Sequence, residues 1–439
     1  MDASALTGKV VTVLGPIEPA ALGTTLMHEH LRVDYSPNFK PGDLPGHPLL
    51  ADTAALRLWD APMGPEHAGL CRSFFAQMAD NMVLGVARAP ARAATAAATG
   101  PSADDEASLC CGGAHAADAA AEADVVHDAT MFRRGGGRAI VECSITGIRA
   151  PHHEAGLVRL SAATGLHVVM GTGYYLARTH PPGMDDRTEA SLRDEFISHI
   201  VDGVEVDVVM PPPTPPVGDP GAVVPDAFVA VPPHAAEATP TRLRVRAGII
   251  GELGCTTKIA PNERKVLRAA AAAFLATGAA ISVHPGYSAD APFEILDELT
   301  ACGVPPGRVV IGHVDRGLLD DAALLRLAQR GCVLEFDQFG WGCSFQHAIH
   351  YGIDYPSDFE RCRMMRALFD AGHGAQVVAS HDIAFKSRLT RFGGHSYNYL
   401  QDYVVPYMLK RGFSADDVTQ VFVHNPARVL TFAAPVTPA

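Results

Sequence analysis

The sequence predicts an α/β fold, a (β/α)8 TIM-like barrel with a short N-terminal β segment and two low-complexity insertions. Three observations predict it: short strand-like runs that are apolar on both faces, helical patterns between them, and a chain of 439 residues. Strands that alternate with helices form parallel sheets, whose strands are covered on both faces. A barrel of this class can occupy more than 400 residues as one unit. We therefore expect a single domain over residues 1–439.

The strand-like runs follow one another along the chain in a regular order. A short β segment at 9–14 comes first and ends at a Gly-Pro turn. The eight barrel strands are expected at 23–30, 139–143, 167–170, 248–253, 280–283, 309–311, 332–336 and 376–379. Most are bounded by glycine or polar residues, as buried parallel strands are. Because no G-x-G-x-x-G motif follows the first strand, a dinucleotide-binding fold is disfavoured.

Helical spacing of apolar residues fills the gaps between these runs. In 263–277, Val266, Leu267, Ala270 and Phe274 fall on one helical face. Similar patterns predict helices at 292–302, 320–330, 358–371 and 397–411. Counting one strand before each helix gives about eight βα units, which favours a closed barrel over an open sheet.

Two segments do not fit the alternation and are interpreted as flexible insertions. Residues 87–123 are rich in alanine, and residues 210–241 are rich in proline. Such biased composition is typical of spacers. The second insertion follows a helix and precedes a strand, so we expect it at the N-terminal face of the barrel, away from the chemistry. The first lies between strands one and two, on the side where an active site is built.

Composition and charge exclude several classes of function. A formal net charge of -13 disfavours a nucleic-acid-binding protein, which needs clustered Lys and Arg. The 9 cysteines lack the spacing of a disulfide framework, so we expect reduced thiols and a cytoplasmic location. The N-terminus shows no secretory signal, and no apolar run is long enough for a membrane span. The expected partner is a small-molecule substrate, and the sequence leaves room for a homodimer.

The motif His28-Glu29-His30 ends the first predicted barrel strand. Residues two apart in a strand point to the same face, so His28 and His30 project together while Glu29 points away. At the carboxyl end of a barrel strand, that shared face is where active sites lie. Two imidazoles directed at one point make half of a metal site, although the spacing by itself is weak evidence.

Four other predicted strands also end in a His or a carboxylate. These residues are Glu252, His284, His313 and Asp382. Buried core histidines would explain any one strand end, but they explain five together poorly. Four imidazoles and two carboxylates exceed the needs of one tetrahedral ion, so we expect two divalent cations that share a carboxylate.

Each ligand receives a role in this hypothesis. Glu252 comes from the middle of the strand order and is the expected bridge. His28, His30 and Asp382 would bind one cation, and His284 and His313 the other. Water held between two cations loses a proton near neutral pH, and Asp382 is the expected catalytic residue that accepts or relays it. This set of ligands suits Zn²⁺, with Mn²⁺, Co²⁺ or Fe²⁺ as alternatives.

The order of these motifs resembles that of the amidohydrolase superfamily, and most closely its phosphotriesterase branch and the phosphotriesterase-related proteins within it. The similar segments are 248–255, 281–286, 312–316, 334–340, 380–383, 391–395 and 425–428. They cover nearly the whole chain apart from the insertions. The resemblance implies a hydrolase with two divalent cations. It also implies that Glu252 replaces the carboxylated lysine of bacterial phosphotriesterases, since the nearest lysine, Lys258, lies beyond the turn.

The resemblance also directs the choice of substrate. Phosphotriesterase-related proteins are associated with hydrolysis of N-acetyltaurine and related N-acetyl amino acids, whereas a phosphotriester or lactone substrate stays open because the same metals polarise P=O and C=O. An anionic amide needs a cationic anchor, for which Lys386, Arg388 and Arg391 are candidates. Tyr175 is expected to line the pocket.

Two rival interpretations lie outside this class of enzyme. One is an aldolase-like barrel that uses Lys258 as a Schiff-base nucleophile, which leaves the histidines unexplained. The other is a non-catalytic binding barrel, which would be marked by the loss of a metal ligand.

Overall fold

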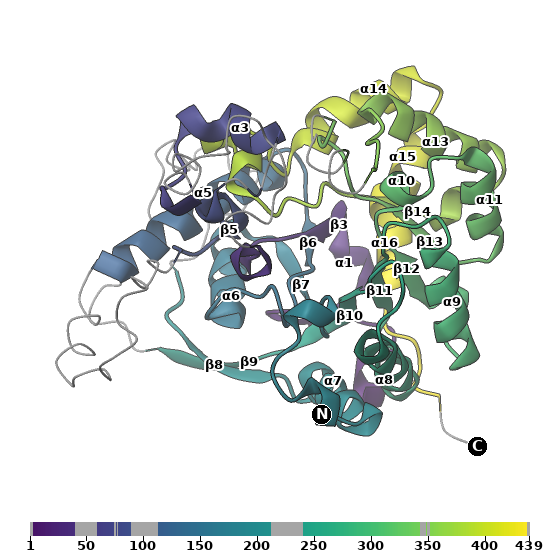
Figure 1. The fold of residues 1–439 in the computed structure, drawn as a ribbon, viewed down its shortest axis with the longest axis horizontal. Coiled ribbons are helices and arrows are strands. Elements are labelled where there is room, and N and C mark those ends of the chain that lie inside the picture. Colours follow the sequence, from purple (N-terminus) through teal and green to yellow (C-terminus); the bar gives the residue numbers. More distant parts are fainter. Residues whose placement is uncertain are drawn as a thin grey trace.

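The computed structural model describes residues 3–39, 59–73, 76, 78–88, 113–211, 240–342, 348 and 352–436. At its centre lies an eight-stranded sheet in the order β14-β13-β12-β11-β10-β7-β6-β3. The strands are β3 (Thr25–Glu29), β6 (Ala139–Glu142), β7 (His167–Thr172), β10 (Ala247–Gly254), β11 (Ile281–His284), β12 (Val309–Ile311), β13 (Val333–Phe336) and β14 (Val377–Ala379). All seven ladders are parallel, and helices surround the sheet (Figure 1). The predicted (β/α)8 barrel is confirmed.

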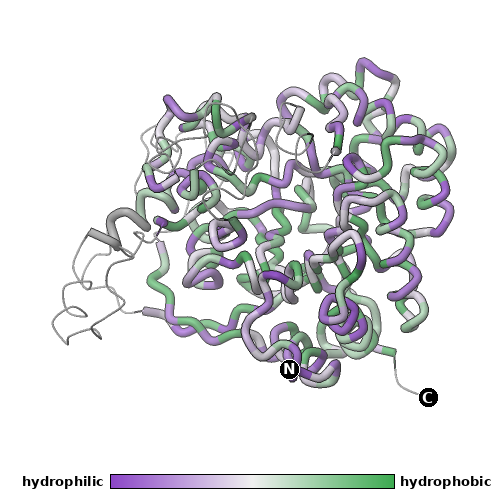
Figure 2. The backbone as a smooth tube through the Cα atoms, viewed as in Figure 1, coloured by the Kyte–Doolittle hydropathy of each residue, from purple (hydrophilic) through white to green (hydrophobic). Residues whose placement is uncertain are grey.

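Alternation along the strands divides the core into two layers. Val141, Val169, Val310, Val333 and Val378 belong to one buried cluster, which fills the barrel interior. Their strand neighbours belong to a larger cluster that includes apolar residues of the surrounding helices. Hydrophobic stretches therefore run along the central strands in Figure 2. This arrangement explains why the strand sequences are apolar on both faces.

The helices that follow the strands form the outer layer. They are α5 (Gly113–Arg134), α6 (His153–Thr164), α7 (Glu189–Val201), α8 (Pro261–Thr277), α9 (Ala291–Ala301), α11 (Asp321–Gln329), α13 (Asp358–Asp370) and α14 (Val405–Lys410). Their ends follow local sequence signals. Helix α13 begins at a capping box in which Ser357 and Glu360 satisfy each other's backbone N–H groups. Helix α8 ends at Gly278, whose φ of 78° is the left-handed conformation that glycine favours.

The last predicted helix, 397–411, contains an irregularity. A π-helical turn, Leu400–Val404, precedes α14, and Pro406 is the second residue of that helix. Proline has no N–H and its ring clashes with a carbonyl one turn earlier, so the hydrogen-bond pattern must widen there. The element is helical as predicted, with this local change of pitch.

The N-terminal β segment closes the end of the barrel opposite the predicted site. Strands β1 (Val10–Thr12) and β2 (Gly15–Ile17) form an antiparallel hairpin, and Val13 donates a hydrogen bond to the carbonyl of Val168 at 2.9 Å. A side chain on Gly248 would collide with the backbone carbonyl of Val11. The hairpin therefore packs against the start of β10, which requires glycine there.

The two insertions differ in part from their expected boundaries. Helix α5 begins at Gly113, so the last third of the segment 87–123 is helix rather than spacer. The proline-rich segment 210–241 is preceded by β8 (Val204–Val208) and ends on β9 (Thr241–Val245), an antiparallel hairpin that we did not predict. Strand β9 leads directly into the start of β10, which places this hairpin at the N-terminal face. Residues 89–112 and 212–239 lie outside the described residues.

The first and last strands of the sheet, β3 and β14, meet at a seam built around the carboxylate of Glu29. Its oxygens accept hydrogen bonds from Ser380 Oγ at 2.7 Å, from the backbone N–H groups of His381 and Ile383 at 2.9 Å each, and from His381 Nδ1 at 2.7 Å. Asp382 N also donates to the carbonyl of His28 at 3.1 Å. Within the described residues, β3 and β14 are not paired by a backbone ladder, and hydrogen bonds to this one buried side chain join them instead.

Candidate metal centre and active site

Six side chains from five strands converge at the carboxyl end of the barrel. His28 lies in β3 and His30 just after it, Glu252 lies in β10, and His284 is the last residue of β11. His313 and Asp382 follow the ends of β12 and β14. Because parallel strands deliver their carboxyl ends to one rim, residues far apart in sequence reach the same point. All six residues expected as metal ligands are brought together.

Glu252 occupies the centre of the cluster. Its Oε2 lies 3.3 Å from His28 Nε2, 3.1 Å from His284 Nδ1 and 3.5 Å from His313 Nε2. Its Oε1 lies 3.4 Å from His30 Nε2. Both oxygens therefore face imidazoles, three at Oε2 and one at Oε1.

The ligand atoms form compact groups of the size that a cation needs. His28, His30 and Asp382 make one group, and Glu252, His284 and His313 make another, with ligand atoms within 4.8 Å of one another in each. These contain the same residues as the two half-sites expected from the sequence. A third group, His28, His313 and Asp337, overlaps them.

Two buried atoms at the centre have no hydrogen-bond partner among the described residues. They are His28 Nε2 and Glu252 Oε1. An unsatisfied polar atom in the core costs about 1–3 kcal/mol, so such atoms are rare in folded proteins. A nitrogen lone pair and a carboxylate oxygen are both ligands of Zn²⁺ and similar ions. The chemistry of these atoms therefore fits a metal.

The outer ring nitrogens of three histidines are held by other buried side chains. His28 Nδ1 lies 2.9 Å from Glu335 Oε2, and His313 Nδ1 lies 2.7 Å from Asp337 Oδ1. His30 Nδ1 contacts Ser144 Oγ at 2.9 Å. A carboxylate that accepts the Nδ1 proton leaves Nε2 as a lone pair directed at the centre. The carboxylates of Glu335 and Asp337 therefore orient two of the candidate ligands, His28 and His313.

Two residues of the cluster, Glu252 and His284, have the charge state that metal binding needs, whereas, despite burial, the carboxylate of Asp337 raises the pKa of His313 to about 9. Burial would raise the pKa of Glu252, but the imidazoles of His28, His284 and His313 outweigh it and hold that pKa well below its usual range. Burial and the adjacent Arg316 lower the pKa of His284 to about 3. Glu252 is therefore an anion and His284 a neutral imidazole, the forms that bind cations.

Backbone conformation directs two of the candidate ligands. His313 and Asp382 both have φ of 54°, in the left-handed region that residues other than glycine rarely adopt. Such residues cluster at functional sites, where the surrounding structure holds them in place. The turn at each strand end brings these two side chains back over the barrel mouth.

Replacing Glu335 by Gln should weaken metal binding about 10- to 100-fold, the usual scale for a partner that orients a ligand. The reason is that a neutral amide holds the Nδ1 proton of His28 less strongly than a carboxylate does. Competition with a chelator of known affinity measures the change. Glu18→Gln, at an exposed site, is the matched control. Equal affinities in the two variants would contradict the orienting role.

A cavity of about 510 Å³ opens over the cluster. His284 and Asp382 line it, so two of the candidate ligands face the cavity directly. Seven aromatic residues line it, namely Tyr35, Phe39, Tyr175, Tyr287, Trp341, Tyr355 and Phe385. Three cationic side chains, Arg178, Lys258 and Arg316, also line it. The cavity can therefore hold a small molecule with an apolar part and an anionic part.

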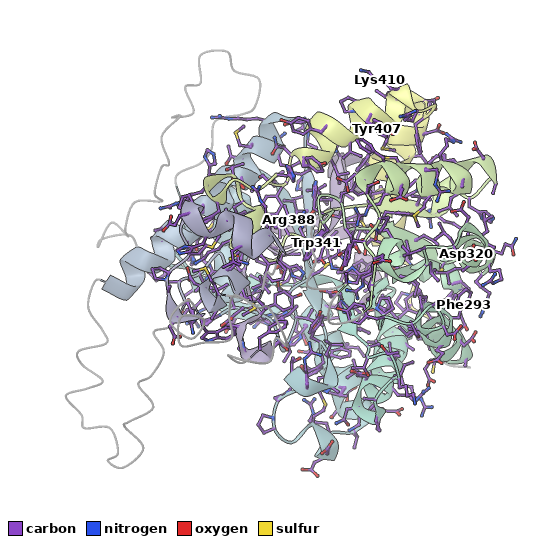
Figure 3. All side chains as sticks on the ribbon, turned by 45° about the horizontal axis from the view of Figure 1, so that its top comes forward. Phe293, Asp320, Trp341, Arg388, Tyr407 and Lys410 are labelled. Atoms are coloured by element: carbon purple, nitrogen blue, oxygen red, sulfur yellow. The ribbon has the colours of Figure 1, made fainter. Side chains whose placement is uncertain are left out.

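The structure places the three candidate substrate-binding residues differently from one another. Tyr175 lines the cavity, with its hydroxyl 3.3 Å from His284 Nδ1. Lys386 instead forms an ion pair with Asp80 at 2.6 Å, and Arg388 is buried behind Trp341 and donates to the carbonyl of Phe339 at 2.7 Å. Figure 3 shows Arg388 beside Trp341, with its guanidinium 5.0 Å from the ring centre.

Neither Lys386 nor Arg388 is among the residues that line the cavity, which differs from the expectation that they face the substrate. Both residues lie in the short 3-10 turn Lys386–Arg388, and their side chains contact Asp80 and the carbonyl of Phe339 instead of the cavity. Arg391, the third candidate, pairs with Asp124. The anion anchor expected from the sequence must therefore be sought among the cations that do line the cavity.

Sequence reasoning missed Arg316, Trp341 and the residues that orient the histidines. Arg316 stands three residues after His313 in the short helix α10 (Val314–Gly317), which was a usable signal for a position on the active-site rim.

The rival role for Lys258 gains no support, because this lysine is exposed whereas Schiff-base chemistry needs a desolvated one. None of the described helices is both long and apolar enough to cross a bilayer.

Comparison with known proteins agrees with this architecture. The model of the phosphotriesterase family matches residues 8–209 and 226–430. N-acetyltaurine hydrolase of Xenopus tropicalis is 30% identical over 98% of this chain and 99% of its own length, and the protein of the same name from Homo sapiens is 29% identical over the same shares. A resiniferatoxin-binding protein from Rhodobacter sphaeroides superimposes with a TM-score of 0.73 and 26% identity, covering 100% of both chains. The chain therefore belongs to the phosphotriesterase family and is a hydrolase.

Proposed function

We propose that this protein is a divalent-metal-dependent amidase that removes the acetyl group from small N-acetyl amino acids such as N-acetyltaurine. The observation that carries the proposal is the position of Glu252, which lies within 3.5 Å of four histidines beneath a cavity of suitable size. The full-length relatives that carry the name N-acetyltaurine hydrolase support the choice of substrate.

We infer two divalent cations, with Zn²⁺ as the preferred ion. His28, His30 and Asp382 would hold one, His284 and His313 the other, and Glu252 would touch both. Imidazole and carboxylate ligands suit Zn²⁺. When bound, the cations supply a Lewis acid for the carbonyl oxygen and lower the pKa of water.

Asp382 is placed to move the proton. Its side chain is partly exposed to the cavity, its Oδ1 lies 3.2 Å from His30 Nε2, and its Oδ2 accepts a hydrogen bond from Gln338 Nε2 at 2.7 Å. Burial would raise the pKa of Asp382, but His30, His28 and His313 outweigh it and lower that pKa. The carboxylate can therefore take a proton from the attacking water and give it to the amide nitrogen as the C–N bond breaks, which releases acetate and the free amine.

The aromatic wall positions the rest of the substrate. Tyr175, Tyr287 and Trp341 line the cavity above the cluster and offer apolar surface to the substrate. A small amide can enter this space with its carbonyl toward His284 and Asp382. A lactone or a phosphotriester offers the same kind of oxygen, so the substrate class must be settled by assay.

The proposal is tested with purified protein whose metal content has been measured. N-acetyltaurine, several N-acetyl amino acids, a lactone and an aryl phosphotriester are assayed before metal removal, after it, and after Zn²⁺ is restored. We expect turnover of the N-acetyl compounds to fall on removal and to return with Zn²⁺. Asp382→Asn should lower kcat at least about 10²-fold, the scale of a lost general acid–base group. Near-native turnover in this variant, or activity toward the lactone or phosphotriester alone, would overturn the proposal.

A further inference from the structure

Arg316 is a buried cation on the wall of the cavity. Only 6% of the residue is exposed. Its Nη2 lies 3.1 Å from His284 Nε2 and 3.0 Å from the carbonyl oxygen of Pro285, and its guanidinium stacks 4.4 Å from the ring centre of Tyr287. These contacts hold the side chain next to a candidate metal ligand.

The charge of Arg316 is not neutralised by a carboxylate within the part of the chain that the structure describes. Its polar partners are the imidazole of His284, the backbone carbonyl of Pro285 and the hydroxyl of Tyr355, all of them neutral. Other buried arginines differ: Arg361 pairs with Asp315 at 2.6 Å, and Arg32 pairs with Glu122 at 2.8 Å. Burial of an unpaired cation costs several kcal/mol, so a site of this kind is retained where an anion from outside completes it.

Arg316 differs from three other cationic residues near the site, Arg388, Arg178 and Lys258, in its burial and its position on the cavity wall. Arg388 is also buried without a carboxylate, but it does not line the cavity. Arg178 and Lys258 do line the cavity, yet both are exposed and are therefore solvated and screened. Arg316 alone among these four combines burial with a place on the cavity wall, and a charge contact is strongest where water is excluded.

We propose that Arg316 binds the anionic group of the substrate, a sulfonate or a carboxylate, and thereby selects anionic amides over neutral ones. This assignment rests on the proposed function, which places the amide carbonyl at the metal cluster. His284 stands between the two subsites: its Nδ1 faces Glu252 at 3.1 Å and its Nε2 faces Arg316 at 3.1 Å. The two subsites are therefore separated by the imidazole of His284. A substrate whose acyl carbon lies over the cluster can place an anionic group that is a few bonds away beside Arg316. The planar guanidinium can donate two parallel hydrogen bonds to either anion.

The experiment compares anionic and neutral substrates of matched shape. kcat/KM is measured for N-acetyltaurine, for N-acetyl-β-alanine and for neutral N-ethylacetamide, in the natural protein and in Arg316→Met. Truncating one partner of a buried charge contact costs about 2 kcal/mol or more, which corresponds to about 30-fold, so we expect kcat/KM for both anions to fall by at least about 30-fold. The neutral amide should change by less than about threefold. Arg326→Met, at an exposed site on α11, is the matched control.

Binding supplies a second readout that does not depend on hydrolysis. Titration calorimetry with butane-1-sulfonate, which cannot be hydrolysed, should show binding to the natural protein and to Arg326→Met but not to Arg316→Met. If Arg316→Met does not fold, Arg316→Gln takes its place, because its amide can still contact the carbonyl of Pro285. Metal content and melting temperature are measured for every variant.

The outcomes separate the two proposals. If N-acetyl amides are hydrolysed but a folded Arg316 variant keeps the preference for anions, the assignment of Arg316 is overturned and the proposed function stands. If no N-acetyl amide is hydrolysed but butane-1-sulfonate binds only when Arg316 is present, the proposed function fails and the anion site stands. If Arg316→Met lowers kcat/KM for N-acetyltaurine but leaves kcat/KM for N-acetyl-β-alanine unchanged, Arg316 binds a sulfonate. The proposal that it also binds a carboxylate would then be overturned.

Discussion

Glu252→Ala should abolish both metal binding and catalysis, with kcat reduced by more than about 10³-fold. The variant removes the one side chain that contacts all four histidines, at 3.1–3.5 Å. Without this carboxylate the cluster loses the anion that contacts all four imidazoles, whereas Asp337 contacts only His28 and His313, and each at Nδ1. Elemental analysis of the purified variant measures metal content, and the N-acetyl amide assay measures kcat.

The matched control is Glu294→Ala, which removes an exposed carboxylate on α9. It should keep metal content and turnover at the level of the natural protein. A Glu252→Ala protein that binds metal fully and turns over substrate normally would rule out the central role of this residue. Circular dichroism on both variants distinguishes the loss of metal from the loss of the fold.

Glu29→Ala should destabilise the protein by about 3–5 kcal/mol, the scale for removing one partner from a buried charged network. The carboxylate is fully buried and accepts hydrogen bonds from Ser380, His381 and Ile383. Its loss leaves these donors unsatisfied at the seam where β3 meets β14. The midpoint of urea unfolding, measured on metal-free protein, reports the change without a contribution from bound cations.

Glu18→Ala is the control for this second prediction, because Glu18 is exposed and its ion pair with Lys9 lies at the surface. Its unfolding midpoint should match that of the natural protein. Glu29→Gln, which keeps one acceptor oxygen, should fall between the two. If Glu29→Ala and Glu18→Ala unfold at the same denaturant concentration, the seam does not depend on this carboxylate.

Most of the barrel could be predicted because each of its strands is short and apolar on both faces. The pattern located all eight strands, and a His or a carboxylate at the carboxyl end of five of them indicated the site. His28, Glu252 and His313 are separated widely in sequence, and the rule that parallel strands end at one rim brings them together. The facing of His381 away from the centre was also predictable from strand alternation, and it contacts Glu29 and the backbone of Leu400 instead.

Features that depend on the path of loops could not be predicted in the same way. Lys386 and Arg388 follow β14, but the 3-10 turn that contains them places their side chains against Asp80 and the carbonyl of Phe339 rather than in the cavity. Arg316 stood within a recognised motif, yet only its burial beside His284 distinguishes it from a surface arginine. The β8–β9 hairpin carries alternating exposed residues around a proline-rich segment, and this composition resembles a spacer more than a strand pair.

The pairing of β3 with the region after β14 has a consequence for biosynthesis. Residues near the beginning of the chain, such as His28, meet Asp382 only after the ribosome has produced nearly all of the barrel. Contacts of such long sequence separation form late, because the entropy of closing the loop must be overcome first. The proposed set of ligands is therefore completed only once residue 382 has been synthesised and β14 has joined the barrel, so we expect metal binding to be a late step of folding.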